Sequence, residues 1–146
     1  MKYSYEITAP VSEVYKTLVA EQLKYYRQFN PQLKKLQPGI KIDTKLPTKL
    51  NKLPVSAQIK ITEIKPSDKF VQETSSSNGV IQQTYRFEKK DDSNVLVYEE
   101  KNHFNGAMAQ SSYGIVGLFY HFVFNKRAKK RAKYLDMRAQ GLVDNL

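Results

Sequence analysis

The sequence contains no cysteine among its 146 residues. The absence of thiols excludes a disulfide framework, a Cys-ligated zinc ion, an iron–sulfur cluster and a cysteine nucleophile. Tryptophan is also absent, and the chain has 2 histidines, His103 and His121. Neither histidine is followed three or four residues later by a second metal-ligating side chain, so we expect no metal site.

Long apolar runs are also missing. The longest, from Ile115 to Phe124, is interrupted by Gly117 and His121 and has about half the length needed to cross a bilayer. The first residues lack the apolar segment of a signal peptide, so a cytoplasmic protein is the default expectation. A phosphate-binding glycine loop, a dinucleotide fingerprint and a Gly-x-Ser-x-Gly elbow are absent, so no cofactor is expected and no enzyme is nominated.

The chain does have many basic and aromatic residues. Lys and Arg total 24 against 14 Asp and Glu, a net charge of +10, and there are 10 Tyr and 7 Phe. A composition of 40% hydrophobic and 26% charged residues is typical of a soluble globular protein, and the length predicts one domain over 1–146. The basic excess raises three alternatives, which are nucleic acid, an anionic membrane or solubility alone.

The hydrophobic periodicity changes twice along the chain. Helical spacing predicts a helix over 11–29 and a long C-terminal helix over roughly 113–144, capped by Ser111 or Ser112. Apolar and polar residues alternate in six other segments, which predicts strands. These segments are 2–8, 40–46, 55–62, 70–76, 81–87 and 95–104. The order predicts an α+β fold, in which a curved antiparallel sheet of about six strands wraps on the C-terminal helix.

Several short motifs accompany this order. The chain opens with Tyr-x-Tyr-x-Ile-x-x-Pro-x-x-x-Val-Tyr over 3–15. The later motifs are Ile59–Pro66, a hairpin signal at Asn78-Gly79, Tyr85–Glu88, Val97–Glu100 and Gly117-Leu118-Phe119 before a basic helix. In this order they resemble the START-like or SRPBCC superfamily, the helix-grip proteins similar to the birch-pollen allergen and polyketide cyclases. Within it, the chain resembles an uncharacterised bacterial family of short START-like proteins.

The resemblance covers essentially the whole chain and implies a sheet that grips an apolar cavity. It implies no reaction, because this fold hosts carriers, cyclases, hydrolases and structural domains. The function it favours is binding of a small hydrophobic or amphipathic ligand, a lipid-like molecule or an aromatic metabolite. A cyclase-type or hydrolase-type enzyme is a further alternative.

The inward faces of the predicted strands mix aromatic and polar residues. A buried polar group without a partner costs about 1–3 kcal/mol, so this mixture predicts a cavity in which water or a ligand is the partner. The alternative is that the strand ends extend into solvent. The predicted ligand-binding residues are Phe70, Gln83, Tyr85, Phe87, Tyr98, Glu100, Asn102, Phe104 and His121. Leu96 completes the apolar wall.

Glu100 is the most distinctive of these residues. An inward carboxylate beside Tyr85 and Tyr98 needs hydrogen bonds from tyrosine hydroxyls, or a cation, to stay ionised. It could serve as a general acid or base or anchor a ligand's polar group, and the alternative is a purely structural hydrogen bond.

The positive charge is concentrated near the C-terminus, where six basic residues fall within eight positions. They are Lys126, Arg127, Lys129, Lys130, Arg131 and Lys133. On a helix they would leave Ala128 and Ala132 to face the sheet. A solvated face, an anionic membrane and nucleic acid all suit such a run, although residues that read bases are missing.

Apolar residues just before the basic run favour the membrane alternative over nucleic acid. The predicted docking surface combines Ile115, Phe119, Phe122, Lys126, Arg127 and Lys130.

Overall fold

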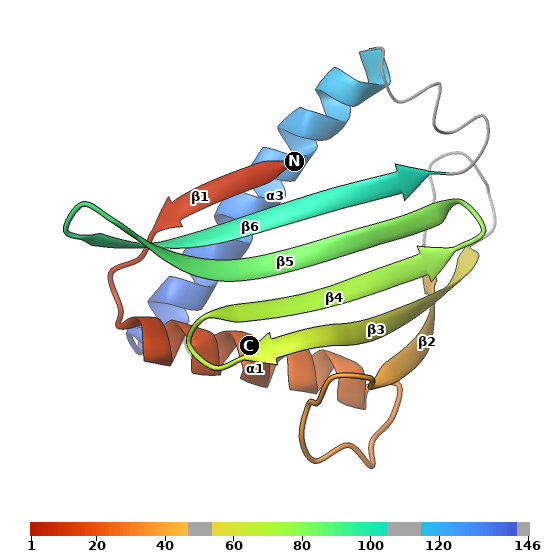
Figure 1. Cartoon of the computed structure of the whole chain (residues 1–146), viewed down its shortest axis with the longest axis horizontal. Helices are drawn as coiled ribbons and strands as arrows, with labels where there is room; N and C mark the ends of the chain where they lie inside the picture. The colour runs from red at the N-terminus through yellow and green to blue at the C-terminus, as the bar shows by residue number, and fades with distance from the viewer. Residues whose placement is uncertain (47–53, 105–114, 143–146) are drawn as a thin grey trace.

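The computed structural model describes residues 1–46, 54–104 and 115–142, with side chains over 1–46, 54–103 and 124–142. In chain order the elements are β1 (Lys2–Glu6), α1 (Val11–Arg27), β2 (Lys41–Leu46), β3 (Val55–Lys65), β4 (Lys69–Ser76), β5 (Gly79–Lys90), β6 (Ser93–Phe104) and α3 (Ile115–Ala139). The strands form one antiparallel 6-stranded sheet in the order β1-β6-β5-β4-β3-β2 (Figure 1). This arrangement confirms the predicted α+β class and its order of elements.

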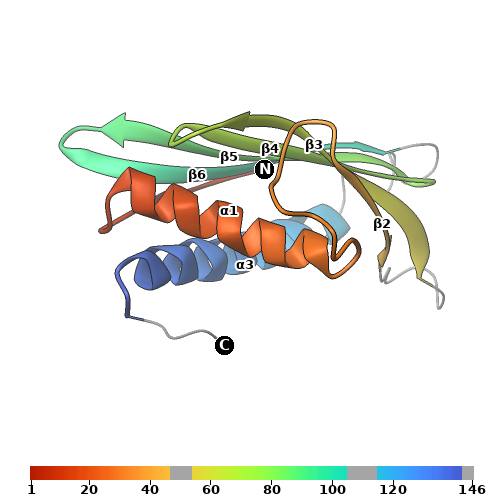
Figure 2. The ribbon, with the colours of Figure 1, turned by 90° about the horizontal axis from the view of Figure 1, so that it is seen from below.

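Both helices lie on the same face of the sheet, which we call the inner face. Figure 2 shows the sheet as one layer with α1 and α3 together on one side of it, and Figure 1 shows that α3 runs obliquely to α1. The opposite, outer face carries no helix of the described part of the chain. In strands the side chains alternate between the two faces, so every second residue of the sheet points toward the helices.

The core lies between the two layers. On the sheet it includes Ile61, Phe70 and Leu96, and the helices contribute Leu18 and Leu135, all at most 1% exposed. Helical spacing of Val14, Leu18 and Tyr26 on α1 explains why that helix buries one face. Ala128 and Ala132 of α3 are buried as predicted, and their small side chains permit close approach to the sheet.

A buried carboxylate ties the C-terminal helix to the first strand. Asp136 of α3 is 1% exposed. It accepts hydrogen bonds from the backbone N–H of Thr8 at 3.0 Å and of Ala9 at 2.8 Å, at the corner between β1 and α1. Charge-assisted bonds of this kind are stronger than neutral ones. Together with the ion pair between Arg138 and Glu21, they hold α3 against α1 and the sheet.

The end of α3 differs from the sequence prediction. The helix was expected to reach residue 144 but ends at Ala139, because Gly141 takes a φ of +76°. The Leu142 N–H donates to the Met137 carbonyl at 2.9 Å, and the Gly141 N–H donates to the Arg138 carbonyl at 3.0 Å. This pattern is a Schellman motif, which terminates helices at a left-handed glycine.

Two further expectations concern the ends of this helix. A helix that reached residue 144 would place Leu142 on the face that packs on the sheet with Leu135. Leu142 is 65% exposed, so this expectation was wrong. The predicted caps, Ser111 and Ser112, lie outside the described residues. Among the described helices, none combines the length and apolar character that a membrane span requires.

The hairpin between β4 and β5 forms where it was predicted. Ser76 pairs with Gly79, so the two loop residues are Ser77 and Asn78, one position earlier than the sequence signal. Gly79 opens β5 with a φ of 138°, a backbone conformation that glycine adopts readily.

Candidate ligand-binding site

A row of polar side chains crosses three strands on the inner face. In the sheet register Gln72 of β4 lies opposite Gln83 of β5, and Gln83 lies opposite Glu100 of β6. Directly opposite side chains on neighbouring strands are close enough to interact. We call Gln72, Gln83 and Glu100 the polar row.

The polar row is part of a continuous chain of hydrogen bonds. The Tyr26 hydroxyl of α1 donates to Gln72 Oε1 at 2.8 Å, and Gln72 Nε2 donates to Gln83 Oε1 at 2.7 Å. Gln83 Nε2 then donates to Glu100 Oε1 at 3.4 Å, and the Tyr98 hydroxyl donates to the same oxygen at 2.5 Å. These inner-face residues therefore satisfy one another, which removes part of the sequence argument that water or a ligand must be their partner.

An aromatic row runs beside the polar row. It lies two residues along each strand from the polar row, toward the end of the sheet where α1 begins. Phe70 lies opposite Tyr85, and Tyr85 lies opposite Tyr98. The ring centroids are 6.5 Å apart in the first pair and 4.7 Å in the second, and Tyr98 stacks on Phe124 of α3 at 5.6 Å. Aromatic contacts at these distances are favourable, so these rings fill the interior.

The aromatic residues that were predicted to line the cavity differ in how deeply they are buried. Phe70 is fully buried, and Tyr85 is nearly so. Phe87 and Tyr98 are partly buried and pack against the core, with Phe87 6.2 Å from the ring of Tyr15.

Arg131 enters the interior from α3, contrary to the sequence expectation. It was predicted to belong to the exposed basic run, but it is half-buried and its guanidinium opposes the rise in the pKa of Tyr85 that burial causes. Its spacing explains the difference, because Phe124, Ala128, Arg131 and Leu135 recur every three or four residues and so share one helix face. A long arginine stem can lie along apolar surface while its guanidinium finds a polar partner.

The interior tyrosines are held in their neutral form. Burial is the main cause that raises the pKa of Tyr98, and the neighbouring Tyr85 and Glu100 add to it. Burial also raises the pKa of Tyr85, against the opposing effect of the Arg131 guanidinium. Neutral tyrosine hydroxyls keep their protons for donation, as the bond from Tyr98 to Glu100 requires.

Asn102 is the exception among the inner-face polar residues. It lies two residues beyond Glu100 on β6, on the same face, and opposite Ile81 of β5. Its Oδ1 atom is buried and has no hydrogen-bond partner among the described residues. A buried acceptor without a donor is unusual in a native structure and calls for an explanation.

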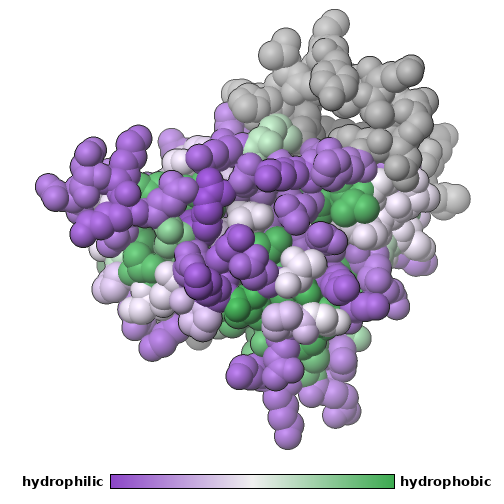
Figure 3. Space-filling view, viewed as in Figure 1, coloured by the Kyte–Doolittle hydropathy of each residue, from purple (hydrophilic) through white to green (hydrophobic). Residues whose placement is uncertain are grey.

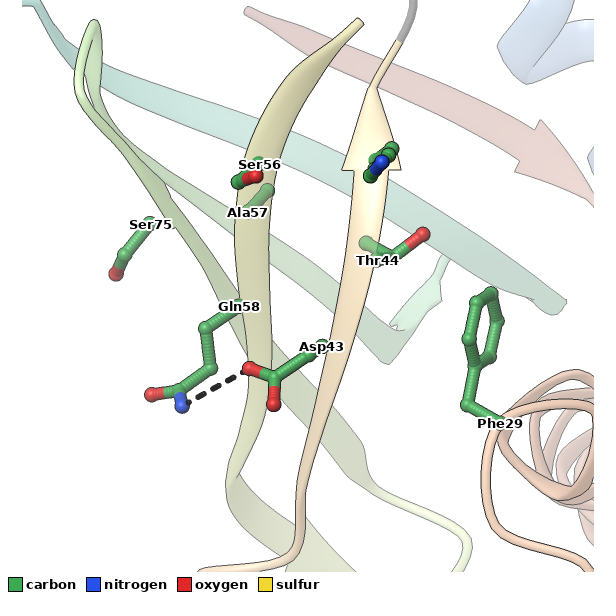
Figure 4. Close-up of a pocket in the computed structure, with 8 residues that line it drawn as sticks. Phe29, Asp43, Thr44, Ser56, Ala57, Gln58 and Ser75 are labelled. Carbon is green, nitrogen blue, oxygen red and sulfur yellow. Dashed lines mark hydrogen bonds between the residues drawn. The ribbon is translucent and has the colours of Figure 1, made fainter.

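Two hollows lie over the described residues, and the predicted ligand-binding residues line neither. The first, of about 860 Å³, lies around β2 and includes Phe29, Asp43, Thr44 and Gln58. Figure 4 shows Phe29 and Thr44 on one side of β2, with Asp43 and Gln58 on the other. This hollow is therefore an open feature of the sheet edge.

The second hollow, of about 300 Å³, lies on the outer face. Its lining combines Lys69, Arg86 and Lys101 with Glu63 and Glu99, and Arg86 pairs with Glu99 at 2.8 Å. Figure 3 views this face and shows mainly hydrophilic residues with smaller hydrophobic areas between them. These ion pairs are typical of a solvated surface.

Several predicted residues lie beyond the described side chains. The backbone of Phe104 pairs with Gly79 at the end of β6. The side chain of Phe104 and those of Ile115, Phe119, His121 and Phe122 on α3 lie outside the described residues, so their roles stay predictions.

The remaining predicted surface residues are accounted for. Lys126, Arg127 and Lys130 are exposed on α3, and so is His103 on β6. Among the described side chains, no group of three or more His, Cys, Asp or Glu residues could hold a metal ion.

Three roles were expected for Glu100, as a general acid or base, as an anchor for a ligand or as a structural hydrogen-bond partner. It is half-buried and lies beside a second titratable group, the Tyr98 hydroxyl. It accepts hydrogen bonds from Tyr98 and Gln83, and the three roles stay predictions.

A six-stranded antiparallel sheet packed on a C-terminal helix defines the helix-grip class of fold. The crystal structure of TTHA0849 from Thermus thermophilus is similar, with a TM-score of 0.64, 12% identity and 99% of each chain covered. So is Ara h 8.0201, with a TM-score of 0.61, 10% identity and 97% of each chain covered. The di-domain ARO/CYC protein StfQ of the steffimycin biosynthetic pathway has a TM-score of 0.53 and 12% identity, over 95% of this chain and 48% of StfQ.

The chain itself belongs to the family described as a domain of unknown function, DUF3284, whose model matches residues 1–121. No curated protein matches the sequence. The structural likenesses agree with the fold that the START-like resemblance implies. At these identities the likenesses establish the fold alone.

Proposed function

We propose that the chain binds a small amphipathic molecule with an apolar body, between the inner face of the sheet and α3. The observation that carries this proposal is the buried, unpartnered Oδ1 atom of Asn102. Leaving a buried acceptor unpaired costs about 1–3 kcal/mol, and a ligand that donates to it would recover that energy. Among relatives of the fold, StfQ belongs to a biosynthetic pathway, which makes a small-molecule role reasonable for this chain.

The burial of the surrounding residues supports the same position. Ile81, Gln83, Glu100 and Asn102 all face inward yet are only half-buried. An apolar residue such as Ile81 gains about 25 cal/mol for each Å² of surface that a ligand covers. An apolar surface next to a few polar groups is the usual composition of a small-molecule site.

The test is a fluorescence titration with N-phenyl-1-naphthylamine, a neutral probe whose emission rises in apolar surroundings. We expect saturable binding of one probe per chain. Ile81→Trp should weaken binding at least tenfold, because the larger side chain occupies the site. Val80→Trp is the matched control, since Val80 is the preceding residue on β5 and points to the outer face.

Thermal unfolding of both variants checks that they fold. Absence of saturable binding would contradict the proposal, and so would equal weakening by the two substitutions. Native mass spectrometry of freshly purified protein would add the mass of any retained molecule.

A second candidate function is docking of α3 on an anionic membrane. It rests on five exposed cations on this helix, Lys126, Arg127, Lys129, Lys130 and Lys133. No acidic residue interrupts them between 126 and 133. Near an anionic bilayer each Lys or Arg contributes about 1 kcal/mol of attraction at moderate ionic strength.

The test for docking is cosedimentation with vesicles of phosphatidylserine and phosphatidylcholine. We expect binding that falls with salt and is lost when Lys126, Arg127 and Lys130 are all changed to Glu. Changing Lys34, Lys35 and Lys41 to Glu, also exposed, alters the net charge equally and should have a much smaller effect.

Two outcomes would overturn docking. One is vesicle binding that persists in high salt and in the α3 variant. The other is binding to duplex DNA without binding to vesicles, which would favour nucleic acid instead.

A further inference from the structure

We propose that the site selects ligands whose polar group donates a hydrogen bond, such as a hydroxyl or an amine, and discriminates against carboxylates. This inference rests on the proposed ligand-binding function and specifies the chemical class of the ligand. It is carried by the direction of the hydrogen-bond chain and by the acceptor at its end.

The hydrogen bonds of the polar row all run in one direction, toward β6. A carboxylate accepts hydrogen bonds and donates none, so Gln83 must present its amide N–H to Glu100. Its carbonyl then faces Gln72, which must in turn present its own N–H to Gln83. The Gln72 carbonyl is left to face Tyr26, whose hydroxyl donates. The amide orientations follow from the carboxylate, and each glutamine amide uses one of its two N–H groups inside the row.

The end of the row therefore presents acceptors. Glu100 receives the last bond of the chain, and a second one from Tyr98. Asn102 adds a buried carbonyl oxygen, on the same strand and face two residues further along. A ligand group that meets these atoms must donate a hydrogen bond, because two acceptors facing each other repel.

The half-buried cation Arg131 acts on the aromatic row. Burial raises the pKa of Tyr85, and the positive charge of Arg131 lowers it. Tyr85 lies opposite Tyr98, two residues along β6 from Glu100. A ligand carboxylate beside Asn102 would face the negative charge of Glu100 from the same strand. Like charges at close range destabilise a complex, so a fatty-acid anion is the wrong chemistry for this position.

The test compares four naphthalenes that share one apolar body and differ only in the polar group. They are 2-naphthol, 2-(aminomethyl)naphthalene, 2-methoxynaphthalene and 2-naphthoate, each used to displace N-phenyl-1-naphthylamine. We expect 2-naphthol and the amine to bind at least about tenfold more tightly than 2-methoxynaphthalene, which cannot donate. The 2-naphthoate anion should bind most weakly.

A variant assigns the preference to Asn102. Asn102→Leu removes the acceptor at similar volume, and we expect the affinity ratio of 2-naphthol to 2-methoxynaphthalene to fall to within about threefold. Asn94→Leu is the matched control, because Asn94 is an exposed residue of the same strand, and it should keep the wild-type ratio. Asn102→Asp retains an acceptor and should favour the cationic amine further, which keeps the test valid if the leucine variant fails to fold.

The outcomes distinguish a failure of the donor preference from a failure of the proposed ligand binding. Equal affinities of 2-naphthol and 2-methoxynaphthalene would overturn the donor preference while leaving ligand binding intact. If 2-naphthoate bound most tightly of the four, and Arg131→Gln abolished that binding, the donor preference would be wrong. The residue that holds the ligand's polar group would then be Arg131. If none of the four probes displaces the dye and the dye itself does not bind, the proposed function fails as well.

Discussion

The two halves of the inner sheet face differ although they share the same strands. Toward the end of the sheet where α1 begins, Phe70 and Leu96 are at most 1% exposed beneath the helices. Further along β5 and β6, Ile81, Gln83 and Asn102 face the same way but remain half-buried. We call these the packed half and the polar half.

The comparison shows how one sheet can combine stability with a binding surface. Close packing against α1 and α3 stabilises the packed half, where Phe70 and Leu96 are fully buried. The polar half is less buried, and hydrogen bonds fix the orientation of its polar side chains. Gln72 stands at the boundary, only two residues from Phe70 on β4, and is buried because the Tyr26 hydroxyl and Gln83 satisfy it.

The largest expected effect is on the free energy of unfolding, when one aliphatic side chain is truncated in each half. Leu96→Ala should lower the free energy of unfolding by about 2–5 kcal/mol, because it leaves a cavity in the packed half. Ile81→Ala removes a side chain of equal size from the polar half and should cost only about 1 kcal/mol. Urea unfolding measures both, and equal losses would show that the polar half is packed as tightly as the other.

An intermediate effect is expected at the centre of the polar row. Gln83→Leu should cost about 1–2 kcal/mol, because the buried amide of Gln72 loses its acceptor. Gln82→Leu makes the same change at the preceding residue, which points to the outer face, and should change stability by less than about 0.5 kcal/mol. If the two variants unfold at the same urea concentration, the hydrogen-bond chain contributes no stability.

The smallest effect concerns alkaline pH. Burial raises the pKa of Tyr98 in the folded chain, so its contribution to stability is fully present below the unfolded pKa of about 10. The contribution declines as pH rises above that value, where the unfolded chain loses the proton first. Tyr98→Phe should therefore make the alkaline decline shallower, by up to about 1.4 kcal/mol per pH unit. Unfolding free energies measured from pH 9 to 11 test this, and parallel curves would contradict it.

Much of this division follows from alternation along the strands. Parity assigned Gln83, Tyr85, Tyr98 and Glu100 to one inner face, and the structure places all four there. Alternation cannot show which residues of different strands lie opposite one another, so the connection from Tyr26 through Gln72 to the polar row was not predicted. That connection depends on strand register and on the position of α1.

The structure differs from the prediction at two other residues of α3, because the prediction considered their charge and not their position on the helix. Arg131 was assigned to the surface by its charge, although its helical spacing matches Ala128 and Leu135 on the packed face. Asp136 was overlooked because a buried carboxylate is rare without partners, and its partners are backbone N–H groups at Thr8 and Ala9. Such distant backbone donors have no signature in the sequence.

The most direct test of the account is a backbone amide NMR titration with N-phenyl-1-naphthylamine. We predict saturating shift changes concentrated at Ile81, Gln83, Glu100 and Asn102 in the polar half, with small changes at Phe70 and Leu96 in the packed half. Shift changes spread evenly over both halves, confined to the outer face, or absent at saturating probe would contradict the account.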